Sequence, residues 1–103
     1  MAIYYNTRTN VLVLFKVIMS SVKTLYDKIV KQNNRANISF RLLCELLISL
    51  GFSQRVSGDH FIFTMDDVDE IINIQPNGSK AMPYQVKQVR DIIIKYKLGG
   101  KWQ

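Results

Sequence analysis

Apolar residues recur at helical spacing in two segments of the first half of the chain. The stripe of the first segment consists of Val22, Leu25, Tyr26, Ile29 and Val30. The stripe of the second consists of Leu43, Leu46, Leu47 and Leu50. Because residues three and four apart share one face of a helix, each stripe predicts an amphipathic helix. Ser20 or Ser21 can cap the first helix. Asn37 or Ser39 can cap the second, and Gly51 ends it.

From Phe52 onward the apolar period changes to that of β-strands. Three strands are predicted, at residues 52–56, 60–65 and 70–75, with turns at 57–59, 66–69 and 76–79. Pro83 is well placed to open a last helix that Gly99-Gly100 ends. The buried stripe of that helix consists of Val86, Val89, Ile93 and Tyr96. The predicted order is helix, helix, three antiparallel strands, helix, which describes an α+β domain with its helices on one face of the sheet.

Residues 1–18 show no pattern that joins them to this predicted domain, which spans residues 19–103. The apolar run at 11–19 is shorter than the roughly twenty residues that cross a bilayer, so no membrane association is expected. It resembles the core of a secretion signal, but no small-x-small cleavage site follows it. We expect residues 1–18 to be an N-terminal extension outside the core. An alternative interpretation, in which Met19 is the natural start, stays open.

Composition limits the class of protein further. The chain has 103 residues, 48% of them apolar, which is enough for one domain with a packed core. Cys44 is the only cysteine, which excludes an internal disulfide and predicts a small buried side chain in a reducing compartment, the cytoplasm. No Cys/His cluster has the spacing of zinc ligands, and we expect neither a metal nor a cofactor.

The charge of the chain is unevenly distributed around a net value of +6. Residues 59–70 contain five of the eight acidic side chains and no Lys or Arg. Residues 79–103 contain six Lys and Arg side chains against Asp91 alone. A basic C-terminal quarter suits a polyanion such as nucleic acid, or an acidic protein partner. It equally suits a lysine-rich helix face that is kept in water for solubility.

The only histidine, His60, opens the second predicted strand. Strand parity places Phe61 and Phe63 on one face and His60 on the other, away from the core. Gly58 allows a tight turn before it and close approach of a ligand backbone. An imidazole that titrates near neutral pH is well suited to moving protons. The alternative is a surface histidine with no role beyond a hydrogen bond.

Two strings, LLISLGFSQRVSGDHFIF and EIINIQPNGSKAMPYQVKQVRDIIIKYKL, resemble the HicA (YcfA-like) toxins of bacterial toxin–antitoxin pairs. The resemblance covers roughly residues 38–98 and extends more weakly back to residue 20. Its most specific elements are the helix end Leu50-Gly51-Phe52, the Gly-x-His-x-x-Phe element at Gly58, His60 and Phe63, and the Val-x-x-Val-Arg core at Val86, Val89 and Arg90.

This resemblance implies a fold like the double-stranded-RNA-binding domain, with an α-β-β-β-α core and an additional N-terminal helix. It implies the toxin of a type II toxin–antitoxin system, an mRNA interferase that blocks translation and uses His60 as its catalytic residue. It also implies a HicB-type antitoxin as partner, and we expect the free toxin to be a monomer. Two departures from the family stand out. Asp59 occupies a position where many members have Ser, and Pro76-Asn77-Gly78 stands where many have a second histidine.

RNA can be cut without a metal. A base removes the 2′-hydroxyl proton, the oxygen attacks the adjacent phosphate, and a cation stabilises the charge on the phosphoryl oxygens. His60 can act as the base. Candidate cations and RNA contacts are Arg55, Gly58, Lys80, Lys87 and Arg90. Two other classes of function stay open: a non-catalytic RNA-binding module of the same shape, and a protein-interaction domain with a basic surface.

Overall fold

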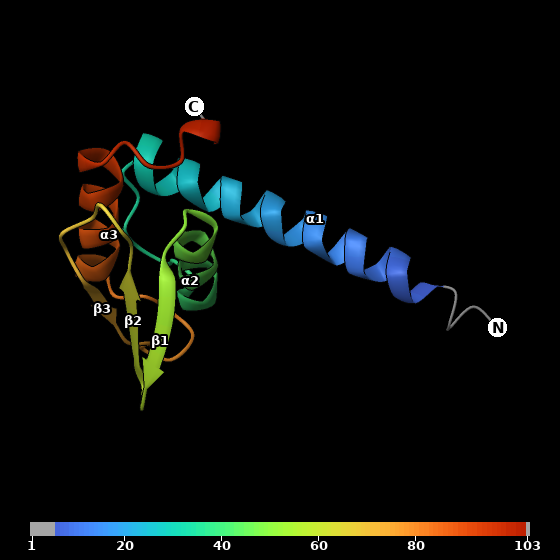
Figure 1. Ribbon diagram of the computed structural model, residues 1–103, viewed down its shortest axis with the longest axis horizontal. Helices are drawn as coiled ribbons and strands as arrows, with labels where there is room; N and C mark the ends of the chain where they lie inside the picture. The colour runs from blue at the N-terminus through green and yellow to red at the C-terminus, as the bar shows by residue number, and fades with distance from the viewer. Residues whose placement is uncertain (1–5, 103) are drawn as a thin grey trace.

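A long first helix leads into a small α+β domain (Figure 1). The computed structural model describes residues 6–102, with side chains described for residues 10–102. Three α-helices are present in this range: α1 (Asn6–Tyr26), α2 (Phe40–Ser49) and α3 (Pro83–Lys95). The strands are β1 (Ser53–Ser57), β2 (His60–Thr64) and β3 (Ile72–Ile74). A π-helical turn, η1 (Asp27–Lys31), continues α1, and a 3₁₀ turn, η2 (Gly100–Trp102), closes the described range. No helix within residues 6–102 is long and apolar enough to cross a membrane.

The three strands form an antiparallel sheet in the order β1-β2-β3. Register pairs Arg55 with Ile62 between β1 and β2, and Ile62 with Asn73 between β2 and β3. Phe63 on β2 is fully buried, whereas His60 and Thr64 are exposed. The helices lie on the face that Phe63 shares (Figure 1). The predicted α+β class, the three-stranded antiparallel sheet and the parity of β2 are therefore confirmed.

The core lies between this sheet face and the helices. It takes its fully buried side chains from the predicted helical stripes and from the inner face of the strands: Val22, Tyr26, Ile29, Leu43, Leu46, Leu47, Phe63, Ile72, Val86 and Val89. Phe40 on α2 meets Phe61 on β2 edge to face, with ring centroids 5.1 Å apart. Cys44 is buried in this core, where desolvation raises the pKa of its thiol to about 11. The prediction that Cys44 is a small buried side chain is confirmed.

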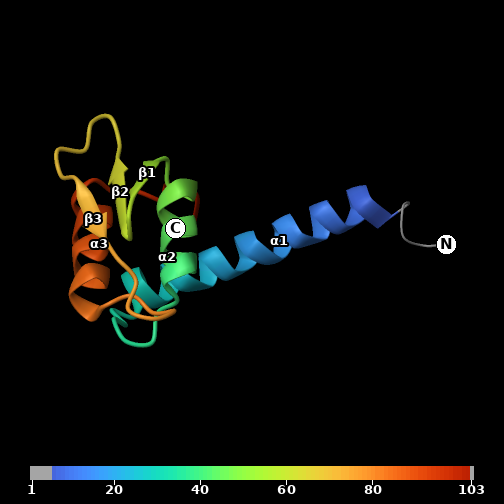
Figure 2. The same ribbon diagram turned by 90° about the horizontal axis from the view of Figure 1, so that it is seen from below.

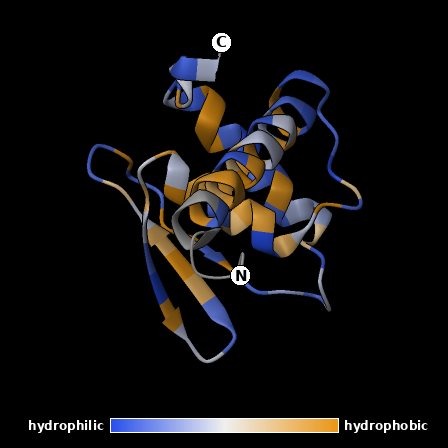
Figure 3. Ribbon diagram, turned by 90° about the vertical axis from the view of Figure 1, so that its right-hand side faces the viewer, coloured by the Kyte–Doolittle hydropathy of each residue, from blue (hydrophilic) through white to orange (hydrophobic). Residues whose placement is uncertain are grey.

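Helix α1 begins far earlier than the sequence pattern predicted. We expected a start near Ser20 or Ser21, but the helix continues without interruption from Asn6, so neither serine is a cap. Residues 11–17 are all apolar except Lys16, so they show no alternation of apolar and polar faces from which a helix could be predicted. No Gly or Pro interrupts them, so the helix can continue through them. Residues 10–17 are exposed, and this part of α1 extends away from the domain (Figure 2). Figure 3, which looks along α1, shows its apolar residues in orange.

The two ends of the second predicted helix agree with the sequence. Ser39 is the N-cap of α2, and its Oγ accepts a hydrogen bond from the backbone N–H of Leu42 at 3.2 Å. Gly51 follows the C-cap with a φ of 111°, a conformation that side chains rarely adopt. Three residues of the predicted stripe, Leu43, Leu46 and Leu47, are fully buried on α2, and Leu50 at its C-cap is partly buried.

The last helix ends earlier than predicted. We expected α3 to run to Gly99-Gly100, but it ends at Lys95, and Lys97 takes the left-handed conformation with a φ of 54°. Gly99 has a different role, because a Cβ at this position would lie 2.6 Å from Cε2 of Tyr26. The hydroxyl of Tyr26 donates a hydrogen bond to the backbone carbonyl of Leu98 at 3.1 Å. The glycine thus lets the C-terminal segment pack closely on α1.

Candidate functional site

His60 lies at the beginning of β2, on the sheet face that points away from the helices. Half of its side-chain surface is exposed, at 50%. Because Ser57 is its register partner on β1, the ring lies next to the β1–β2 hairpin at one end of the sheet. An imidazole in this position is reachable by a large substrate.

Asn73 on β3 holds the imidazole ring from the neighbouring strand. Its Oδ1 lies 3.0 Å from Nδ1 of His60. An amide oxygen can only accept a hydrogen bond, so Nδ1 carries the proton of the neutral ring. Nε2 is then the nitrogen with the free lone pair. The contact therefore leaves a base on the ring atom that points away from β3.

Asp59 lies on the other side of the ring. Its Oδ1 is 3.8 Å from Nε2 of His60, which is too long for a hydrogen bond but within ion-pair range once the ring is protonated. The Asp59 side chain is 73% exposed, so water weakens the attraction. Residues next to each other in an extended chain point in opposite directions, so a direct Asp59–His60 pair is not assured. The two side chains nevertheless form a loose contact. It can stabilise an imidazolium without holding the neutral ring.

Gly58 and Asp59 form the two-residue loop of the β1–β2 hairpin. Gly58 has a φ of 62°, and it occupies the first central position, where type II′ turns take glycine. A Cβ at Gly58 would meet no atom within 4 Å, so the backbone conformation and not crowding requires the glycine. The surface beside His60 is therefore open at Gly58.

Arg55 is the sequence-predicted cation that the sheet brings to the same face as His60. It pairs with Ile62 in the register, and Ser57 pairs with His60, so Arg55 and His60 are diagonal neighbours across β1 and β2. Arg55 is exposed. A guanidinium at this position can reach a phosphate that contacts the imidazole.

The other three predicted cations lie in the helical layer or beside it. Lys80 follows β3 in the loop that pairs with Ser39, at the N-terminus of α2. Lys87 is exposed on α3, and its Nζ lies 2.7 Å from Oδ2 of Asp91. Arg90 donates from Nε to the carbonyl of Ile29 at 3.0 Å and from Nη2 to that of Val30 at 3.5 Å. The Arg90 guanidinium therefore holds η1 against α3.

The site includes one residue that the sequence argument did not identify. Asn73 lies in the predicted third strand, but its contact with His60 depends on the register between β2 and β3. Strand parity alone could have predicted that Asn73 and His60 both lie on the outward face. It could not have predicted that they contact each other. Within residues 10–102, no group of three or more His, Cys, Asp and Glu side chains is arranged to hold a metal ion.

In comparisons with known proteins, no family model, curated protein or solved structure matches this chain.

Proposed function

We propose that this chain is a HicA-like toxin, an endoribonuclease with an architecture like that of the double-stranded-RNA-binding domain. The observation that carries the proposal is the environment of His60. The ring is exposed on an open sheet face, Asn73 fixes its tautomer, and Arg55 shares its face. The sequence elements that resemble this family support the same proposal.

In the proposed reaction, Nε2 of His60 takes the proton from a ribose 2′-hydroxyl. The 2′-oxygen then forms a bond to the adjacent phosphorus, and the bond from phosphorus to the 5′-oxygen breaks. The leaving 5′-oxygen takes up a proton, which the imidazolium can supply. Asp59, 3.8 Å from Nε2, stabilises the imidazolium between the two proton transfers. Arg55 stabilises the charge that develops on the phosphoryl oxygens.

Binding of mRNA would use the remaining basic residues as phosphate contacts. Lys80 and Lys87 are exposed lysines that can contact the RNA backbone. Arg90 stays in the set that the sequence predicts, although its guanidinium already binds two backbone carbonyls. Gly58 leaves room for the backbone beside His60. Such contacts bind RNA of any sequence with similar strength.

A cytoplasmic ribonuclease must be masked in its own cell. We propose an acidic HicB-type antitoxin that covers His60 or blocks access of RNA to it. Co-expression followed by affinity purification should recover the two proteins together. Production of the chain alone should arrest growth, and cells that grow normally with a high level of folded chain would argue against any need for masking.

The decisive experiment measures cleavage of a labelled mRNA by the wild type, His60→Ala and a matched control, Thr64→Ala. Thr64 lies on the same strand and face as His60 and is exposed, so both substitutions remove a surface side chain without opening the core. We expect His60→Ala to lose about a hundred- to ten-thousand-fold in rate. Thr64→Ala should cleave within a few-fold of the wild type. A chelator should not inhibit the wild type.

Circular dichroism should show the same folded state in all three proteins. A folded His60→Ala chain that cleaves at the wild-type rate would remove His60 from the mechanism. A wild type that binds RNA with a steep salt dependence but never cleaves it would instead support a non-catalytic RNA-binding module.

A further inference from the structure

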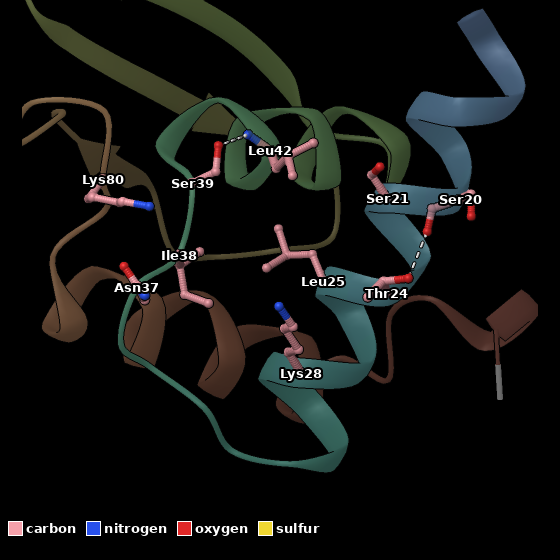
Figure 4. Close-up of a pocket in the computed structure, with 10 residues that line it drawn as sticks. All are labelled: Ser20, Ser21, Thr24, Leu25, Lys28, Asn37, Ile38, Ser39, Leu42 and Lys80. Carbon is pink, nitrogen blue, oxygen red and sulfur yellow. Dashed lines mark hydrogen bonds between the residues drawn. The ribbon is translucent and has the colours of Figure 1, made fainter.

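A hollow of about 300 Å³ lies in the helical layer, between the C-terminal half of α1, the segment before α2 and the loop that holds Lys80 (Figure 4). Its lining consists of Ser20, Ser21, Thr24, Leu25, Lys28, Asn37, Ile38, Ser39, Leu42 and Lys80. We call it the Lys28–Lys80 pocket. Its volume lies at the lower end of the range for sites that hold small molecules.

Two lysines from distant parts of the chain enter this pocket. Lys28 belongs to η1 and Lys80 to the loop after β3, and both side chains reach toward the space in front of Ile38 (Figure 4). Within residues 10–102, neither ammonium group forms a hydrogen bond or an ion pair, and no acidic side chain is part of the lining. Asp27, next to Lys28 in the sequence, is engaged elsewhere by Lys23 and Lys31. The pocket therefore carries two positive charges that nothing in this range neutralises.

Polar groups of the pocket add hydrogen-bond donors of fixed position. Ser39 Oγ accepts from the Leu42 backbone N–H, which leaves its own hydroxyl proton to donate into the pocket. Ser21 and Asn37 offer a further hydroxyl and an amide. The N–H of Leu42 is already satisfied by Ser39, so it is not one of these donors.

Backbone hydrogen bonds join two of the three parts that line the pocket, namely the segment before α2 and the loop that holds Lys80. Lys80 forms a β-bridge with Ser39. On either side of this bridge, the N–H of Phe40 donates to Ser79 at 3.0 Å and the N–H of Ala81 donates to Ile38 at 2.8 Å. The position from which Lys80 enters the pocket is consequently fixed relative to the start of α2, and little backbone ordering is needed when a ligand binds.

We propose that the Lys28–Lys80 pocket binds a phosphate group, carried by a nucleotide or by an RNA strand. Two unpaired ammonium groups and several hydroxyl and amide donors, with no carboxylate in the lining, match the charge and acceptor oxygens of phosphate. The proposal adds Lys28 as a ligand-binding residue. It does not depend on cleavage by His60, which lies on the opposite, outward face of the sheet.

Titration of the full chain with inorganic phosphate, followed by NMR of backbone amides, tests the proposal. We expect saturable shifts at Lys28, Ser39 and Lys80. The Lys28→Gln/Lys80→Gln double variant should bind phosphate at least roughly tenfold more weakly, because two charge-assisted contacts are lost. The control, Lys16→Gln, removes an exposed lysine of α1 outside the pocket and should change the affinity less than about twofold.

Further titrations distinguish the sources of the phosphate. One uses adenosine monophosphate, and the other uses a short 2′-O-methyl oligoribonucleotide, which lacks the hydroxyl needed for cleavage. If the mononucleotide binds more tightly than inorganic phosphate, and the double variant loses this gain, the pocket is a nucleotide site. If only the oligonucleotide shows such a gain, the pocket binds the RNA backbone. The proposal is overturned if no probe gives saturable shifts at the pocket. It is also overturned if a folded double variant binds every probe as tightly as Lys16→Gln does.

Discussion

The side-chain oxygen of Asn73 lies 3.0 Å from Nδ1 of His60, across the β2–β3 pair. The register places Asn73 opposite Ile62, so the asparagine and the histidine are diagonal neighbours on the outward face of the sheet. Both residues are exposed, and their contact joins the two strands at the proposed catalytic group. In the proposed reaction, Asn73 contacts His60 and not the RNA, so its expected role is that of a positioning residue.

Replacing Asn73 by alanine should lower kcat by about tenfold to a hundredfold, by analogy with groups that orient metal-bound histidines through the second ring nitrogen. KM should change little, because Asn73 would fix the tautomer of His60 without binding RNA. Asn73→Asp keeps an acceptor for the Nδ1 proton and should recover most of the rate. Steady-state cleavage kinetics of the three proteins check this. An unchanged kcat in Asn73→Ala would show that the hydrogen bond does not serve the reaction.

The sequence predicted the position of His60 but only part of its surroundings. Alternation along β2 was enough to turn His60 away from Phe61 and Phe63, because side-chain direction in a strand follows directly from parity. The contact between Asn73 and His60 depends on the number of residues that connect β2 and β3, because this number decides which residues of the two strands pair. Alternation excludes a shift of one residue between β2 and β3, but it does not choose among registers that differ by two residues.

Two further residues show why tertiary contacts escaped prediction. Arg90 was predicted to be a cation that contacts RNA, yet it reaches carbonyls at the end of η1, about sixty residues earlier in the chain. Lys28 lies outside the apolar stripe of the first predicted helix, yet it enters a pocket with Lys80. Local patterns identified which side of each helix is buried. The packing of helices against one another decides which polar side chains meet.

Acid should weaken the fold through Glu70. Hydrogen bonds from Lys95 and from the hydroxyl of Tyr96 lower the pKa of this carboxyl to about 2, at donor–acceptor distances of 2.8 and 2.6 Å. A carboxyl with a lower pKa in the folded state stabilises the fold fully above its ordinary pKa of 4.5. That stabilisation is lost as the pH falls from about 4.5 toward about 2.

Glu70→Gln should therefore be less stable than the wild type at neutral pH, and the difference should shrink as the pH falls through this window. Denaturant unfolding at a series of pH values measures it. The control is Asp66→Asn, which removes a carboxylate from the same connection. Within the described residues, Asp66 itself forms no ion pair. If the difference between Glu70→Gln and the wild type is constant across the window, the contacts with Lys95 and Tyr96 do not stabilise the charged form.

Arg90→Ala should destabilise the fold by about 1–3 kcal/mol, because two backbone carbonyls at the end of η1 lose their donor. Arg90→Lys should not restore the stability, since an ammonium group cannot reproduce the two-pronged contact. Lys87→Ala, one turn earlier on α3, is the matched control. Its exposed ion pair with Asp91 contributes only about 0.3–0.5 kcal/mol.

Urea unfolding of these variants gives the stabilities, and RNA binding at several salt concentrations gives the number of phosphate contacts. Loss of a phosphate contact flattens the salt slope by about one unit. If Arg90→Ala is as stable as Lys87→Ala but has a flatter salt slope than the wild type, Arg90 serves RNA and not the packing of α3 on η1.

A chain that begins at Met19 should fold with little loss of stability. Residues 10–17 are exposed along α1, and Ile18 is the one residue of the deleted segment that is described as packing partly against the core. We expect the melting temperature to fall by less than about 4 °C, which corresponds to less than about 0.5–1 kcal/mol for a domain of this size. Thermal melts of the full and shortened chains measure this directly.

Leu25→Ala in the full chain sets the scale for a residue of α1 that belongs to the core. Leu25 is 5% exposed, and its truncation should cost about 2–5 kcal/mol, which is a fall of about 10 °C or more. A shortened chain that melts as early as Leu25→Ala would place residues 1–18 in the core, against our expectation.

The shortened chain should also scatter less light on concentration, because the deleted segment exposes Val11, Leu12, Leu14 and Phe15 to water. Removal of that apolar surface should then improve solubility at almost no cost in stability.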